Sequence, residues 1–204
     1  MIAWKFLSAG RIAPFTRYAW PMPGHWVEAD GGAVVCFDGV HACRAMDLPF
    51  WVDDELWEVE LDGAIDMADG KLAAERGRLT RRVAAWNAAT ADDYGLACTL
   101  RARDHALHAL RRTGVHVDDL EHAFTVRAVA NAARVAERDG PATARIATAF
   151  AADAADSALD GQPATAAYVA AHMAGVLRTA EAEEDERRWQ AAWLAERLEL
   201  PLDD

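Results

Sequence analysis

The amino-acid sequence changes character near residue 70. The first 68 residues contain five of the eight tryptophans and four of the six phenylalanines, and prolines and glycines interrupt them often. Aromatic and β-branched residues broken up by Pro and Gly favour short strands and turns. After residue 70 prolines become rare, alanine dominates, and apolar residues recur at helical spacing. The sequence therefore predicts an α+β protein, with a small aromatic-rich β domain over 1–68 and an α-helical bundle of about five or six Ala-rich helices over 69–204.

The clearest strand pattern is the alternation of polar and apolar residues over 55–61, which is typical of a strand with one buried face. The Asp-Gly-Gly sequence at 30–32 predicts a hairpin turn that pairs the segments on either side of it. Asp62 and Gly63 are expected to end the strand at 55–61. Further strands are predicted over 1–7, 26–29, 33–37 and 40–44.

Glycine and aspartate clusters divide the second part of the chain into helices, and Pro141 and Pro163 lie at helix starts. The acidic run 181–186 has the character of a solvated helix start, where negative charge is favourable. His105 and His108 lie one turn apart. A helical wheel places His105 nearly opposite the buried face and His108 at its edge. The predicted helices span 69–89, 91–112, 117–138, 141–159, 163–181 and 183–199.

Charge and composition exclude several classes of function. The formal net charge of −12 argues against general nucleic-acid binding, which needs clustered basic side chains. No apolar stretch approaches the roughly 18 residues of a membrane span. Three cysteines without a secretory signal at the N-terminus predict a cytoplasmic protein. Lys5 and Lys71 are the only lysines, which indicates a GC-rich genome rather than a function.

The stretch 34–63 is the candidate site region. On a strand from Val40, His41 and Cys43 face the same way, and a turn before it brings Cys36 beside them. With His25 upstream, these two thiols and two imidazoles form a donor set typical of zinc. The alternative is that both cysteines are small buried hydrophobic residues and that His41 bonds to the backbone.

The same stretch offers candidates for catalysis. His41 and Cys43 are a candidate base and nucleophile, and Glu58 and Glu60 project from one strand face as a candidate acid–base pair. Arg44 is placed to pair with one of these carboxylates or to hold an anionic ligand. The alternative for the two glutamates is an exposed, solvated strand face.

Residues 1–65 resemble a poorly characterised family of small phage and bacterial proteins with a Gly-Phe-His-Ala-Cys segment. Val40 replaces the aromatic residue of that segment, and the resemblance implies no activity. The matching residues are Lys5, Cys36, Gly39, His41, Cys43 and Val59.

The same segment also resembles the centre of the ADP-ribosyltransferase fold, in which a Gly-hydrophobic-Tyr strand binds NAD. The resemblance implies a first strand over 39–42, a short helix over 47–51 and a second strand over 56–63. It places His41 at the position of a stacking tyrosine. Lys5 stands where the fold has His or Arg, and the sequence offers no catalytic glutamate in register.

From these observations we expect a ligand- or partner-binding protein with a recognition surface at His41, Cys43 and Arg44, against Trp51 and Trp57. Its partner would be a small molecule or a protein, and the two tryptophans are the candidate cofactor-binding residues. One alternative is a small enzyme that uses His41, Cys43 and Arg44 with a carboxylate, with an NAD-binding fold as one option. The second alternative is a zinc-stabilised interaction domain. They differ in bound metal, in nucleotide binding and in turnover.

Overall fold

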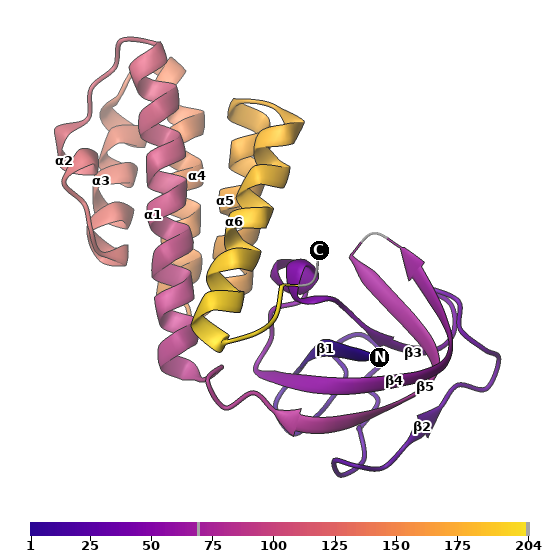
Figure 1. The fold of residues 1–204 in the computed structure, drawn as a ribbon. Helices are drawn as coiled ribbons and strands as arrows, with labels where there is room; N and C mark the ends of the chain where they lie inside the picture. Colours follow the sequence, from indigo (N-terminus) through magenta and orange to yellow (C-terminus); the bar gives the residue numbers. More distant parts are fainter. Residues whose placement is uncertain (69, 203–204) are drawn as a thin grey trace. The chain divides into compact units, whose positions relative to one another are not determined.

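The computed structural model describes residues 1–68 and 70–202 (Figure 1). It confirms the predicted α+β class, because an N-terminal antiparallel sheet precedes a set of helices that pack together. The chain divides into two compact units. The β unit contains Met1–Asn87 and the C-terminal residues from Ala191, and the helical unit contains Ala88–Gln190.

Five strands make up the sheet within the described residues, and every pair of neighbours is antiparallel. The central strand β5 pairs with β4 along one side and with both β2 and β3 along the other, while β1 pairs with β4. A 3₁₀ helix, η1 (Ala45–Phe50), occupies the place where a short helix was expected over 47–51. The strands are β1 (Ile2–Leu7), β2 (Val27–Glu28), β3 (Val40–Ala42), β4 (Glu55–Ala68) and β5 (Lys71–Arg82).

The end of β3 closes the sheet onto β1. The Trp4 N–H donates to the Cys43 carbonyl and the Cys43 N–H donates to the Trp4 carbonyl, each over 2.8 Å. A circuit of strands therefore runs from β1 through β4 and β5 to β3 and back to β1 at the Trp4–Cys43 bridge. It is open where β1 and β3 exchange no further backbone hydrogen bonds. The Lys5 ammonium lies at this opening and donates to the His41 carbonyl over 2.6 Å.

The core of the β unit lies on the inner face of this circuit. In β1 the alternate residues Ala3 and Leu7 are buried there, and Val59 and Leu61 of β4 lie against them. Lys5 occupies the position between Ala3 and Leu7 and lies opposite Trp57 in register. Because successive strand residues face opposite sides, the amine of Lys5 emerges on the apolar inner face.

The prediction of a helix over 69–89 is wrong, because β5 occupies Lys71–Arg82. Alanine and arginine favour a helix locally, but pairing with neighbours on both sides overrides that preference. Gly77 shows how closely β5 is packed: a Cβ atom there would lie 2.7 Å from a methyl carbon of Val40. The β unit thus continues to Asn87, beyond the predicted limit at residue 68.

Two further predictions are wrong, that of a strand over 33–37 and that of a strand end at Asp62 and Gly63. Residues 33–37 form a tight turn rather than a strand, in which Val34 and Asp38 exchange backbone hydrogen bonds of 2.9 Å. Asp62 and Gly63 do not end β4, which continues to Ala68. The register of β4 against β5 shifts between Asp62 and Ile65, and Gly63 has a φ of 81°. A glycine in this conformation absorbs the extra residue of a bulge.

The helical unit is built on small side chains. Fully buried alanines, among them Ala102, Ala133 and Ala170, let the helices approach closely. The predicted helix 117–138 is divided, because Thr125 accepts a hydrogen bond from the Ala128 N–H and caps a new helix. The helices are α1 (Ala88–Arg112), α2 (Asp118–Glu121), α3 (Val126–Asp139), α4 (Ala142–Leu159), α5 (Pro163–Leu177) and α6 (Ala180–Leu198). In the described part of the chain, none of them has the length and hydropathy of a membrane span.

Candidate functional site

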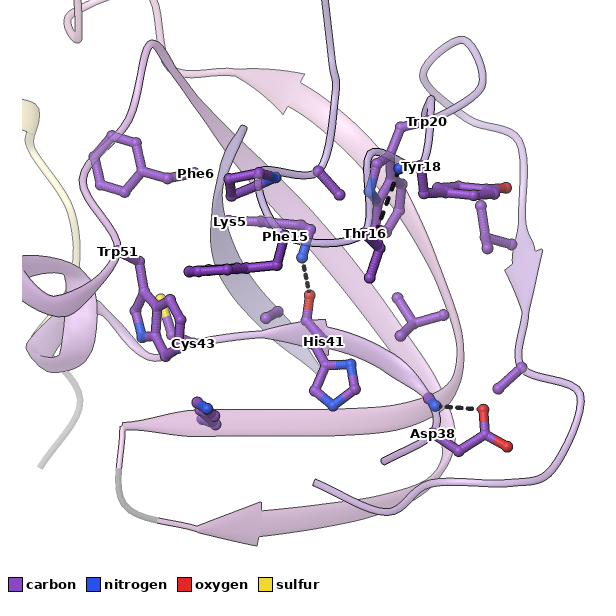
Figure 2. A pocket seen from close by; sticks show the side chains of 18 of the residues that line it. Lys5, Phe6, Phe15, Thr16, Tyr18, Trp20, Asp38, His41, Cys43 and Trp51 are labelled. Carbon is purple, nitrogen blue, oxygen red and sulfur yellow. Dashed lines mark hydrogen bonds between the residues drawn. The ribbon is translucent and has the colours of Figure 1, made fainter. Parts of the chain in front are cut away.

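A cavity of about 700 Å³ lies in the β unit beside the Trp4–Cys43 bridge (Figure 2). Its volume is typical of small-molecule sites in proteins, which occupy roughly 300–1,000 Å³. Its walls come from β1, from residues 13–20, from β2 and from the turn that leads into β3. The side chains that give it chemical character are Lys5, Phe15, Trp20, His41, Trp51 and Lys71.

Aromatic rings form two pairs on the cavity wall. Phe15 meets Trp51 edge to face with ring centroids 6.1 Å apart, and Tyr18 meets Trp20 in the same way at 6.2 Å. Phe15 is 81% exposed, so a large apolar ring at this cavity is left without full burial. Figure 2 shows the Lys5 ammonium between the two pairs in that view. The cavity therefore presents flat apolar surfaces close to its amines, with Lys5 over the Trp20 ring and Lys71 over the Trp51 ring.

Lys5 is one of two lysines that line the cavity. Its Nζ lies 5.5 Å from the centroid of the Trp20 ring and donates to the His41 carbonyl. Burial lowers the pKa of Lys5 from 10.5 to about 8, because a charged amine is poorly solvated there. At neutral pH the group is a cation that coexists with an appreciable fraction of free amine.

Lys71, the other lysine of the chain, lines the same cavity. Its Nζ lies 4.9 Å from the centroid of the Trp51 ring and 3.3 Å from the Cys36 sulfur. All other cationic side chains apart from histidine are arginines. Both lysines of the chain therefore lie at one cavity, which composition alone did not show.

His41 lies on β3 with its imidazole at the cavity. The Cys36 N–H donates to His41 Nε2 over 3.1 Å, which requires Nε2 to be an unprotonated acceptor. Burial and the positive charge of nearby Lys5 both lower the pKa of His41. The ring is therefore neutral at pH 7, and it holds Cys36 in a left-handed conformation with φ at 69°.

The four residues proposed for zinc do not form a metal site within the described residues, although Cys36, His41 and Cys43 line the same cavity. Cys43 is buried, its thiol donates to the Trp4 carbonyl, and burial raises its pKa. Cys36 is exposed and faces Lys71. His25 is exposed and bonds to the Met22 carbonyl over 3.0 Å. Across residues 1–68 and 70–202, no group of three or more His, Cys, Asp or Glu side chains is arranged to hold a metal ion.

The two candidate glutamates lie on the face of β4 opposite the core. Glu58 accepts hydrogen bonds from Thr80 at 2.7 Å and from Arg81 at 2.9 Å. Glu60 accepts one from Arg78 at 2.8 Å. Because each glutamate pairs with the arginine opposite it in register, these contacts account for their positions as cross-strand ion pairs. Neither glutamate lines the cavity.

Of the remaining candidates, one lies at the cavity. Trp51 lines it, and its indole N–H donates to the Gly70 carbonyl over 2.8 Å, which fixes the ring. Trp57 belongs to the core and donates to Glu55. Arg44 pairs with Asp47 at 2.8 Å and does not line the cavity. The structure thus brings His41, Cys43 and Trp51 together with the zinc candidate Cys36, and leaves Arg44, Trp57 and both glutamates elsewhere.

Sequence reasoning missed Lys5, Lys71 and the aromatic residues of 13–20. Their signals are the scarcity of lysine and the density of aromatic rings in a Pro-containing loop. Neither signal shows which face of β1 the amine takes, because that depends on the register with β4.

A second polar cluster lies inside the helical unit. Glu186 is fully buried, although the acidic run 181–186 was expected to be solvated. Its Oε2 accepts from Arg101 at 2.6 Å and lies 2.9 Å from His105 Nε2. His105 is only 7% exposed, so the prediction that it lies opposite the buried face is wrong. His108 is exposed.

Comparisons with protein-family models, with curated proteins and with solved structures give no match to this chain.

Proposed function

We propose that the β unit binds a small organic anion with a flat, apolar body in the cavity beside β3. The observation that carries this proposal is the Lys5 amine held on an aromatic wall of a cavity of ligand size. An ammonium group has three donors, and among the described residues Lys5 uses one of them, toward the His41 carbonyl. A bound carboxylate or phosphate would take another.

The charge around the cavity limits the ligand further. Lys5 and Lys71 supply the positive charge, while Glu28, Asp30 and Asp38 also line the cavity. In Figure 2, Asp38 lies beyond His41, away from Lys5. A ligand with one localised anionic group fits this distribution better than a uniformly charged one, and its rings would lie against Phe15, Trp20 or Trp51.

The proposal retains the expected cytoplasmic location, where Cys36, Cys43 and Cys98 stay as free thiols. NAD shares two features with this ligand class, a localised anionic diphosphate and flat rings. The resemblance to the ADP-ribosyltransferase fold makes it the first compound to test, followed by aromatic carboxylates.

Calorimetric titration of purified protein with NAD and with a series of benzoates and indole carboxylates tests the proposal. We expect at least one compound to bind, and Lys5→Met to weaken that binding by about tenfold or more, since charge-assisted hydrogen bonds contribute roughly 1.5–3 kcal/mol. Arg81→Met is the matched control, because it removes one positive charge on the other face of the sheet. Equal loss in both variants, or no binding across the series, contradicts the proposal.

A further inference from the structure

The choice of lysine at the cavity is the starting point. The chain uses arginine wherever else it carries a permanent cation, and both of its lysines line one cavity. Arginine binds carboxylates better through its two-pronged geometry and keeps its proton at all accessible pH values. A lysine differs in one chemical respect that matters here: it can lose its proton and become a nucleophile.

We propose that Lys5 forms a reversible imine with an aldehyde or ketone that carries an anionic group and a flat apolar body. This inference rests on the proposed function, since the same cavity must first bind the ligand. Lys71, on the Trp51 ring and 3.3 Å from the Cys36 sulfur, supplies the second cation of the cavity. It would hold the anionic group once the Lys5 nitrogen, which holds that group before reaction, is taken up in the imine.

The step balances without a further reactant. The lone pair of neutral Nζ of Lys5 attacks the carbonyl carbon, and the nitrogen loses a proton while the carbonyl oxygen takes one up, which gives a neutral carbinolamine. Loss of that oxygen as water, with one hydrogen from the nitrogen, leaves a C=N bond between ligand and lysine. Water added back releases the carbonyl compound and the amine, and no electron is transferred to or from the protein.

The surroundings of Lys5 favour this chemistry in two ways. Burial among apolar cavity residues, which include Ala13 and Val40, favours a neutral amine over an ammonium group. With the pKa of Lys5 lowered from 10.5 to about 8, a larger fraction of this lysine than of an ordinary one is free amine at pH 7.5.

Reductive trapping on the full chain tests the inference. The protein is incubated at pH 7.5 with 4-formylbenzoate and cyanoborohydride, which reduces an imine to a stable secondary amine. The adduct adds the mass of the aldehyde less one oxygen, and peptide mass spectrometry locates it among three amines, those of Met1, Lys5 and Lys71. We expect Lys5 to be labelled at least tenfold faster than Lys71. We also expect 4-methylbenzoate, which has no aldehyde group, to protect Lys5 from labelling but not the Met1 amine.

Two variants separate the imine from simple anion binding. Lys5→Arg keeps the charge but cannot form an imine, so it should lose the adduct while it still binds 4-methylbenzoate. Lys71→Arg should keep the Lys5 adduct. Labelling confined to Met1 or Lys71 in wild-type protein that binds 4-methylbenzoate overturns the imine and leaves the proposed function intact. Absence of labelling, together with no binding by any compound of the calorimetric series, overturns the two together. The wild-type labelling pattern decides the matter even if a variant does not fold.

Discussion

At the scale of single residues, Lys5 is the group whose properties depend most on its surroundings. Its position on β1 puts the amine on the inner face of the sheet circuit, with Trp57 opposite it. The hydrogen bond to the His41 carbonyl satisfies a backbone group at the opening between β1 and β3. Lys5 therefore has a structural role at this edge as well as its proposed role in binding.

That position predicts a specific dependence of stability on pH. The pKa of Lys5 is about 8 in the folded protein against 10.5 as its ordinary value, so the unfolded chain binds more protons between these two values. Stability conferred through Lys5 must then rise as pH increases from 8 to 10.5, by on the order of 2 kcal/mol. Urea unfolding of wild type and Lys5→Met at pH 7, 8, 9 and 10 measures it. The free energy of unfolding of the wild type should increase relative to that of the variant across this range. A constant difference would refute the lowered pKa of Lys5.

At the scale of secondary-structure elements, β5 organises the β unit. It pairs with three other strands, and its close packing depends on Gly77, which lies against Val40 of β3 and Leu61 of β4. Glycine within a strand often marks such a close approach of neighbours. The position of β3, and with it the cavity, depends on the absence of a side chain at residue 77.

We expect Gly77→Ala to destabilise the protein by about 1–3 kcal/mol, because the added methyl group would overlap Val40 and Leu61. The measurement is the midpoint of urea unfolding. In a Val40→Ala background, which removes one overlapping group, the same substitution should cost less. Equal costs in the two backgrounds would show that the contact with Val40 is not responsible.

At the scale of the whole molecule, contacts between distant parts of the sequence hold the helical unit together. Glu186 of α6 joins Arg101 and His105 of α1 across more than 80 residues. Burial raises the pKa of Glu186, but hydrogen bonds from His105 and Arg101 outweigh it and hold that pKa below its usual value. The stability that Glu186 contributes is then fully present at pH values above the ordinary pKa of a glutamate. It is lost as pH falls through the lowered pKa of Glu186.

Removing this carboxylate should therefore be expensive. We expect Glu186→Ala to lower the free energy of unfolding at pH 7 by about 3 kcal/mol, because it leaves buried His105 and partly exposed Arg101 without their partner. Glu184→Ala, on the exposed side of the same helix, is the matched control and should change stability by less than about 0.5 kcal/mol. Circular dichroism during thermal unfolding compares the two, and similar losses would contradict the buried network.

The amino-acid sequence by itself determined the α+β class, the strand at 55–61 and most helices. These features depend on periodicity and on local signals such as Gly and Pro, which act over a few neighbouring residues. Of the residues predicted for the site, His41, Cys43 and Trp51 line one cavity. Local signals could not separate Glu58 and Glu60 from these residues, because cross-strand partners are not local in sequence.

Only the tertiary structure decided that 71–82 forms a strand and that both lysines line one cavity. An alanine- and arginine-rich segment has a helical preference of its own, and hydrogen bonds from strands on both sides outweigh it. A one-residue change in the register of β1 would move Lys5 to the opposite face. The cavity and its chemistry therefore follow from strand pairing across the sheet, which composition and local pattern do not encode.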